Sequence, residues 1–213
     1  MTYTVKEIYF TLQGEGAQTG RPAVFLRFAG CNLWSGLERD REAADCNFCD
    51  TDFRGTDGPG GGKFAGPHDL ADKVALAWPP DNQANAPPLV VCTGGEPLLQ
   101  LDEPLIAALH EQGFEIAVES NGTIAAPPGL DWLTVSPKIG NPLKQTSGDE
   151  LKLVYPQAGG DPEQFEGLDF LAFFLQPMDG PELAENTLAT IAYCAQHPNW
   201  QLSLQAHKYL GIP

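Results

Sequence analysis

The sequence has little positive charge and no long apolar run. It contains 12 lysines and arginines against 28 aspartates and glutamates, which gives a formal net charge of −16. This charge argues against nucleic acid or an anionic membrane as the main partner, because both would repel it. No apolar stretch approaches the ~20 residues of a membrane span, and residues 1–6 lack the apolar core of a signal peptide. These absences predict a cytoplasmic protein.

Cysteine is also scarce, with five residues in 213. An odd number of cysteines without a secretion signal argues against a disulfide framework. Cys92 and Cys194 lie in apolar patterns and are predicted to be core residues. The other three form a C-x14-C-x2-C cluster at Cys31, Cys46 and Cys49. Metal, cluster or redox chemistry is the better interpretation of these three.

The apolar patterns predict one α/β domain over residues 1–213. Short apolar strands are expected at 23–29, 89–92, 115–119, 132–136, 150–154, 170–175 and 200–205, and helices at 67–78, 103–112 and 181–197. In the last helix, Leu183, Leu188, Ile191 and Ala192 are predicted to form one buried stripe. The segments 54–66 and 79–88 are expected to be loops. Continuous apolar strands are typical of parallel sheets, so we expect an incomplete TIM-like barrel of about six parallel strands and three helices.

Polar or glycine-rich motifs follow the predicted strands. They are Thr93-Gly94-Gly95-Glu96, Ser120-Asn121-Gly122, Ser136-Pro137-Lys138, Gln176-Pro177-Met178-Asp179 and Gln205-Ala206-His207-Lys208. In barrel-like parallel sheets the carboxyl ends of the strands carry the active site. The pattern therefore indicates an enzyme.

The three clustered cysteines fit two kinds of site about equally well. Three thiolates can hold a [4Fe–4S] cluster whose fourth iron is open to an exogenous ligand. They could also hold a structural zinc ion with a fourth ligand from elsewhere. No histidine lies near the cysteine loop, the nearest downstream being His68.

The downstream motifs favour the cluster. Gly94 and Gly95 let the backbone approach a ligand closely, and the Glu96 carboxylate can accept a hydrogen bond from an ammonium group. Phe48 lies between the last two cysteines. Together these features resemble the radical S-adenosylmethionine (SAM) superfamily, in which the Gly-Gly-Glu motif binds the SAM amino group and the aromatic residue lies beside its adenine.

Further motifs resemble one family within that superfamily. Residues 10–16 read Phe-Thr-Leu-Gln-Gly-Glu-Gly, residues 27–34 read Arg-Phe-Ala-Gly-Cys-Asn-Leu-Trp, and residues 49–51 read Cys-Asp-Thr. From residue 8 onward the chain is similar to the 7-carboxy-7-deazaguanine synthase family of queuosine biosynthesis. The insert at 32–45 departs from the usual C-x3-C-x2-C spacing and matches a known variant of that family.

The resemblance implies conversion of 6-carboxy-5,6,7,8-tetrahydropterin to 7-carboxy-7-deazaguanine with loss of ammonia, started by hydrogen abstraction at C6 and assisted by Mg²⁺. It also implies a homodimer and an electron donor such as a flavodoxin or ferredoxin. Thr51 is the expected Mg²⁺ ligand.

The candidate ligand-binding residues form two sets. The SAM set is Phe48, Asp50, Gly94, Gly95, Glu96, Ser136, Lys138 and Gln176, and the substrate set is Leu12, Gln13, Gly14, Glu15, Arg27, Thr93, His207 and Pro213. Gln13 and Glu15 suit the aminopyrimidinone edge of a pterin, and Arg27 suits its carboxylate. Glu119 is a weaker candidate. For Arg27 a salt bridge at the rim is the alternative interpretation, for Lys138 a surface amine, and for His207 a satisfied polar residue.

Two other functions compete with this interpretation. A glycyl-radical activating enzyme shares the SAM motifs but acts on a protein, and the long insert argues against it. A zinc-stabilised module without catalytic activity would be colourless and would not respond to SAM.

Replacing Cys31 separates the cluster from the two core cysteines. Cys31→Ala should abolish the cluster, because Cys46 and Cys49 alone do not hold a cubane well, whereas Cys194→Ala should leave it intact. Iron and sulfide analysis after anaerobic reconstitution measures both. A full iron content in Cys31→Ala would contradict the assignment.

Overall fold

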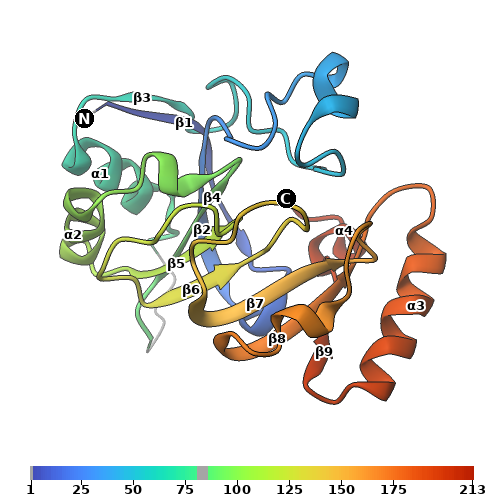
Figure 1. Cartoon of the computed structure of the whole chain (residues 1–213). Coiled ribbons are helices and arrows are strands. Elements are labelled where there is room, and N and C mark those ends of the chain that lie inside the picture. The colour runs from blue at the N-terminus through green and yellow to red at the C-terminus, as the bar shows by residue number, and fades with distance from the viewer. Residues whose placement is uncertain (1, 81–85) are drawn as a thin grey trace.

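The computed structural model describes residues 2–80 and 86–213. Within them, one nine-stranded sheet has the order β3-β1-β2-β4-β5-β6-β7-β8-β9 (Figure 1). The strands are β1 (Tyr3–Leu12), β2 (Pro22–Phe28), β3 (Gly62–Phe64), β4 (Leu89–Gly94), β5 (Glu115–Ser120), β6 (Trp132–Val135), β7 (Ser147–Tyr155), β8 (Asp169–Pro177) and β9 (Trp200–Leu202). From β2 to β9 all neighbours are parallel, and the two ends of the sheet are not paired with each other. The expected incomplete α/β barrel is confirmed, with one parallel strand more than the six expected.

Two strands were not predicted. β1 pairs with β2 and β3 pairs with β1, both antiparallel, so they extend the sheet beyond its parallel part. β1 mixes polar and apolar residues because it lies outside the doubly covered centre. β3 falls inside the glycine-dense segment 54–66, which was expected to be loop throughout. Of the other expected loop, 79–88, residues 81–85 lie outside the described residues.

The three longer helices agree with the predicted segments. They are α1 (Pro67–Ala77), α2 (Glu103–Glu111) and α3 (Leu183–Gln196), and a short α4 (Ala206–Leu210) follows β9. The Asp102 carboxylate caps α2 by accepting a hydrogen bond from Leu105 N at 3.1 Å. In Figure 1, α1 and α2 lie together at one end of the sheet and α3 lies at the other. Four short 3-10 helices occupy connections: η1 (Gly16–Gln18), η2 (Glu38–Ala43), η3 (Pro97–Leu99) and η4 (Pro162–Phe165).

The predicted apolar stripe of α3 is wrong. Leu188 is 69% exposed and Ile191 is 47% exposed, whereas Asn186 and Thr190 are buried. Asn186 donates from Nδ2 to the carbonyl of Met178 at 3.0 Å, so a polar contact anchors this helix to the loop after β8. The helix packs against the terminal strands β8 and β9, where there is less apolar surface to cover than at the centre of the sheet.

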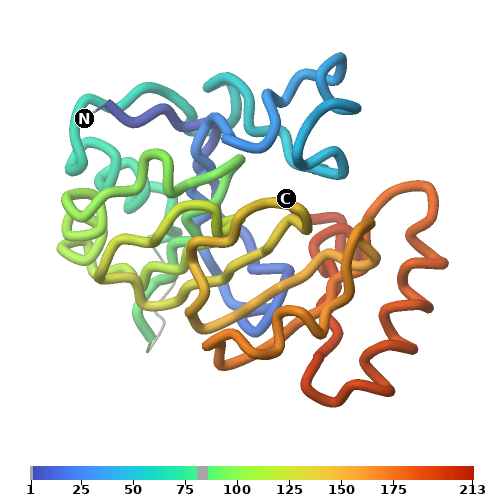
Figure 2. Tube along the Cα trace, in the orientation of Figure 1, coloured from blue at the N-terminus to red at the C-terminus, as the bar shows by residue number. Residues whose placement is uncertain are grey.

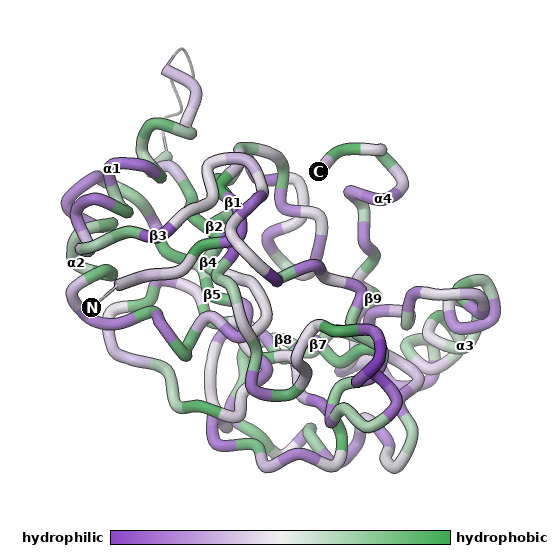
Figure 3. The backbone as a smooth tube through the Cα atoms, turned by 90° about the horizontal axis from the view of Figure 1, so that it is seen from above, coloured by the Kyte–Doolittle hydropathy of each residue, from purple (hydrophilic) through white to green (hydrophobic). Residues whose placement is uncertain are grey.

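Alternate residues of each central strand face opposite sides of the sheet. Val24, Leu26 and Phe28 of β2 pack in the main core, which also contains Leu70 of α1 and Leu105 of α2. The hydropathy colouring shows the apolar residues running along β2, β4 and β5 through the middle of the molecule (Figure 3). The intervening side chains point to the other face, where the cavity described below is found.

The C-terminal segment connects the last strand, β9, with the end of β1 and the loop that follows it. The Ser203 hydroxyl accepts from Gly16 N at 2.9 Å, and Ala206 N donates to the Gly14 carbonyl at 2.9 Å. The Thr11 hydroxyl donates to the Pro213 carbonyl at 3.0 Å. The chain after β9 therefore reaches back to the end of β1 and covers the side that an incomplete barrel leaves open. Figure 2 follows this path along the trace.

No helix in the described part of the chain is long and apolar enough to cross a membrane.

The buried face of α1 should contribute strongly to stability. Leu70→Ala removes a fully buried side chain and should lower the free energy of unfolding by about 2–5 kcal/mol. Leu76→Ala changes the same residue type in the same helix at a position that is 81% exposed, so its effect should stay within ~0.5 kcal/mol. Urea titration of both variants checks this, and equal losses would contradict the packing described.

Candidate active site

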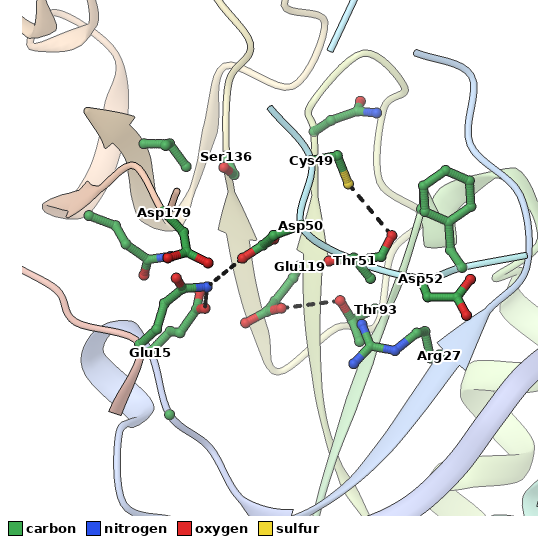
Figure 4. A pocket seen from close by; sticks show the side chains of 18 of the residues that line it. Glu15, Arg27, Cys49, Asp50, Thr51, Asp52, Thr93, Glu119, Ser136 and Asp179 are labelled. Carbon is green, nitrogen blue, oxygen red and sulfur yellow. Dashed lines mark hydrogen bonds between the residues drawn. The ribbon is translucent and has the colours of Figure 1, made fainter. Parts of the chain in front are cut away.

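A cavity of about 410 Å³ opens at the carboxyl ends of the parallel strands. All the residues predicted from the sequence line it except Glu96. Its walls come from the cysteine loop, the strand ends and the C-terminal segment, and Figure 4 shows ten of its residues labelled. Residues far apart in the sequence are therefore brought together as expected.

The three clustered cysteines lie in one region of the cavity wall. Leu33 N donates to Cys31 Sγ at 3.4 Å. The thiol hydrogen bond between Cys46 and Cys49 lowers the pKa of Cys49 to about 6 and raises that of Cys46. Burial raises the pKa of Cys31. Two mutually hydrogen-bonded thiols with a third facing the same space suit a cubane cluster with one iron left open.

Across residues 2–80 and 86–213, no group of three or more His, Cys, Asp and Glu side chains is placed around a single metal ion. A structural zinc site needs four such ligands converging on one point.

The insert at 32–45 folds back onto the cysteine loop. The Arg41 guanidinium lies 4.1 Å from the centre of the Trp34 ring, and its Nη1 donates to the Cys49 carbonyl at 2.9 Å. The Trp34 ring in turn meets Phe53 edge-on at 5.6 Å between centroids. Through these contacts the insert stabilises the backbone at Cys49.

Gly94 and Gly95 are required because another backbone segment passes very close to both positions. A Cβ at Gly94 would lie 2.3 Å from the Phe28 carbonyl oxygen, and one at Gly95 would lie 2.3 Å from the Gly30 carbonyl oxygen and 2.6 Å from Cys31 Cβ. Gly94 also has φ +145°, where other residues are strained. The pair lets the end of β4 pack directly against the segment that leads into Cys31.

Glu96 takes a different position from the one expected. Its carboxylate is fully buried and does not line the cavity. It accepts from Leu98 N at 2.9 Å, the Ser120 hydroxyl at 2.9 Å and Asn121 N at 2.8 Å. Burial raises its pKa despite these donors. These three hydrogen bonds engage both carboxylate oxygens and link the turn after β4 to the end of β5.

The remaining candidates for SAM form a polar wall. Lys138 Nζ donates to the Ser136 carbonyl at 2.7 Å and lies 5.9 Å from the centre of the Phe48 ring. It is not a surface amine, and burial lowers its pKa. Across the cavity, Asp50 accepts from Lys208 Nζ at 2.6 Å and from Gln205 Nε2 at 3.0 Å.

Gln176 lies deeper, where its Oε1 accepts from the Ser203 hydroxyl at 3.0 Å. This contact ties the end of β8 to the start of the C-terminal segment.

Arg27 lines the cavity and is also held by neighbours. Its Nε donates to Glu7 Oε1 at 2.8 Å and its Nη2 to the Tyr9 hydroxyl at 2.9 Å. The salt bridge considered as an alternative therefore exists, yet the guanidinium still faces the cavity. Both interpretations describe the same side chain.

Glu119 joins two polar side chains of the substrate set. Its Oε1 accepts from Gln13 Nε2 and its Oε2 from the Thr93 hydroxyl, both at 3.1 Å, and Figure 4 shows Thr93 and Glu119 pointing toward one another. Glu15 pairs with Lys152 and accepts from Gln205 Nε2 at 3.1 Å.

His207 lies against the backbone of the substrate set. A Cβ at Gly14 would be 2.4 Å from His207 Nδ1, so only a glycine fits here. Leu12 and Pro213 complete this side of the cavity.

Several lining residues lie outside the two candidate sets. Asn121, Asp179, Gln205 and Lys208 belong to the polar motifs predicted at the strand ends, whereas Lys152 belongs to none of them. Lys152 carried the clearest signal, since Glu150-Leu-Lys-Leu-Val alternates charged and apolar residues in a strand that was taken to be buried on both faces.

Comparison with known proteins shows the family of the chain. No protein-family model matches the chain. It is 62% identical to a 7-carboxy-7-deazaguanine synthase of Caulobacter vibrioides and 63% identical to one of Bradyrhizobium diazoefficiens, in both cases over the full length of both chains. The chain belongs to the 7-carboxy-7-deazaguanine synthase family.

A solved structure of the family shares the fold. The crystal structure of QueE from Escherichia coli superposes with a TM-score of 0.66 at 27% identity, covering 97% of this chain and 95% of that one. The expected family and its fold are therefore confirmed.

Replacing Glu96 tests its structural position. Glu96→Ala should lower the free energy of unfolding by about 2–4 kcal/mol, because it leaves buried backbone donors without partners. Glu103→Ala, at an exposed position of α2, should change it by less than ~0.5 kcal/mol. Thermal unfolding of the apoprotein measures both, and an unchanged stability in Glu96→Ala would contradict the role assigned here.

Proposed function

We propose that the chain converts 6-carboxy-5,6,7,8-tetrahydropterin to 7-carboxy-7-deazaguanine with release of ammonia, in queuosine biosynthesis. SAM bound at a [4Fe–4S] cluster would supply a 5′-deoxyadenosyl radical that takes hydrogen from pterin C6. The observation that carries this proposal is the cavity itself, because three thiols and a pterin-sized set of polar groups face one space.

Cys31, Cys46 and Cys49 would hold the cluster, and the neighbouring wall would hold SAM. Phe48 offers an aromatic face for adenine, and Lys138 offers an ammonium group for the SAM carboxylate. The turn at Gly94 and Gly95 lies next to Cys31, so its backbone would border the ligand of the open iron. Ser136, Gln176 and Asp50 supply further donors and acceptors.

Glu96 would support the proposed SAM site by fixing the turn at Gly94 and Gly95 through its buried hydrogen bonds.

The pterin would occupy the other side of the cavity. The carboxylate of Glu15 and the amide of Gln13 suit the donors and acceptors of its aminopyrimidinone edge, with the backbone of Leu12 and Gly14 beside them. Arg27, fixed by Glu7 and Tyr9, would receive the substrate carboxylate. Thr93, His207 and Pro213 would close the pocket.

Thr51 would bind the magnesium ion. It lies on the cavity wall two residues after Cys49, and its hydroxyl has no hydrogen-bond partner among the described residues. A hydroxyl oxygen is a suitable hard ligand, and Mg²⁺ is commonly held by few protein groups, with substrate and water completing its shell.

The reaction also needs a reductant for the cluster. A flavodoxin or ferredoxin in the cytoplasm would supply the electron, and a homodimer is the proposed assembly.

Anaerobic reconstitution tests the whole proposal. The chain is loaded with iron and sulfide, reduced, and given SAM and Mg²⁺ with or without the carboxytetrahydropterin. Product and ammonia should form in equal amounts only when the pterin is present, and SAM should not be consumed, because it is re-formed in each turnover. Chromatography of the nucleobase and of SAM measures this.

Three other outcomes would each point to a different error in the proposal. A colourless protein with one zinc per chain would refute the cluster. A reduced cluster that cleaves SAM but leaves the pterin unchanged would refute the substrate. Activation of a partner protein in its place would support the glycyl-radical alternative.

A further inference from the structure

A single buried lysine lies beneath the proposed pterin pocket. Lys152 is on β7, is 4% exposed, and its Nζ binds Glu15 and lies 3.5 Å from Glu119 Oε1. Glu150, two residues earlier on the same face of the strand, is 2% exposed. Two carboxylates from distant parts of the chain therefore contact one ammonium group, and a third lies on the same face of its strand.

The carboxylates have few other partners. Glu15 accepts from Gln205, Glu119 from Gln13 and Thr93, and Glu150 from Ala17 N at 2.8 Å. All these partners are neutral. Within the described residues, Lys152 is the only cation that forms an ion pair with any of the three.

Two other lysines that line the cavity have different partners. The buried Lys6 pairs with Asp52 and Asp57, and the half-buried Lys138 contacts Ser136 and the Phe48 ring.

This arrangement affects the pKa values of the carboxyl groups around Lys152. Burial alone pushes carboxyl pKa values upward. For Glu15, the charge and hydrogen bond of Lys152 more than offset burial, and the pKa is lowered. For Glu150, which forms no ion pair with Lys152, burial prevails and the pKa is raised.

We propose that Lys152 is a positioning residue that keeps Glu15 ionised and holds Glu119 in place, so that Glu15 presents only hydrogen-bond acceptors to the N–H groups of the pterin. The inference rests on the proposed function, since it concerns the same pocket. A protonated carboxyl group would also be a donor and would meet the ring donors unfavourably. Lys152 would thereby set specificity for a heterocycle whose bound edge carries N–H donors.

The experiment measures ligand binding without turnover. Calorimetry with 6-carboxypterin, the oxidised and unreactive form of the substrate, is run on the reconstituted enzyme at several values between about pH 5.5 and about pH 8. The variant is Lys152→Met, which keeps the length of the side chain, and the control is Lys144→Met at an exposed position. Comparing each variant with the wild type at each pH cancels the titration of the ligand itself.

Lys152→Met should bind 6-carboxypterin about 10–100-fold more weakly near pH 6, as expected for removal of one partner of a buried ion pair. The deficit should shrink as the pH rises, because the Glu15 carboxyl group then loses the proton that it keeps at low pH once the cation is missing. Lys144→Met should match the wild type throughout. Lys152→Arg should restore most of the affinity and remove the pH dependence of the ratio.

Three outcomes would overturn the inference. Lys152→Met could bind like the wild type, or it could lose the same factor at every pH, as a purely steric role predicts. If Lys152→Met does not fold, the double variant Glu15→Gln with Lys152→Met should fold, because it removes one uncompensated charge. A failure of that variant would assign Lys152 to packing. Absence of binding to the wild type would refute the proposed substrate instead.

Discussion

The contact between the Gly94-Gly95 turn and the segment from Phe28 to Cys31 is the constraint on which the site depends. Two parallel strands end at the same level there, and only glycines permit their backbones to touch. Glu96 then ties that turn to β5 through buried hydrogen bonds. These contacts thus hold three parts of the chain together, namely Cys31, the turn proposed to border SAM and the end of β5. The cluster and its ligand can therefore share a site without any catalytic side chain at the point of contact.

Parallel register carries this order across the sheet. Arg27 is paired with Thr93, and Thr93 bonds to Glu119 on the next strand. Further along, Thr134 of β6 is paired with Glu150, which precedes Lys152 by two residues on β7. Since side chains of a strand alternate between faces, these polar groups all point away from the helix-covered core. The apolar residues between them supply that core. A single alternating pattern therefore serves both stability and the proposed binding surface.

The sequence could predict the strands that are buried on both faces and the motifs at their ends, because apolar runs followed by glycine or polar residues are local signals. It missed β1, which mixes polar and apolar residues, and β3, which has three residues inside a glycine-dense segment. It misjudged α3, because an apolar stripe at helical spacing does not reveal that Leu188 and Ile191 lack a covering layer. For Glu96 the motif was recognised, but the direction of its side chain was set by donors on β5. Lys152 was overlooked because an apolar strand was assumed to have no polar face.

The charges around the cavity explain why Lys152 is important. A chain with a net charge of −16 must still bind a ligand that itself carries a carboxylate. Four of the cations at the cavity are paired with carboxylates: Lys6 with Asp52 and Asp57, Arg27 with Glu7, Lys208 with Asp50 and Asp179, and Lys152 with Glu15 and Glu119. Pairing lowers the repulsion that an anionic ligand meets, while leaving oriented donors and acceptors on the wall. The paired cations therefore hold these carboxylates in place around the ligand, and pairing with lysine keeps the pKa of Glu15 and of Asp50 low despite the desolvation of both carboxyl groups. The acidic composition therefore bears on the chemistry of the pocket as well as on the exclusion of nucleic acid as a partner.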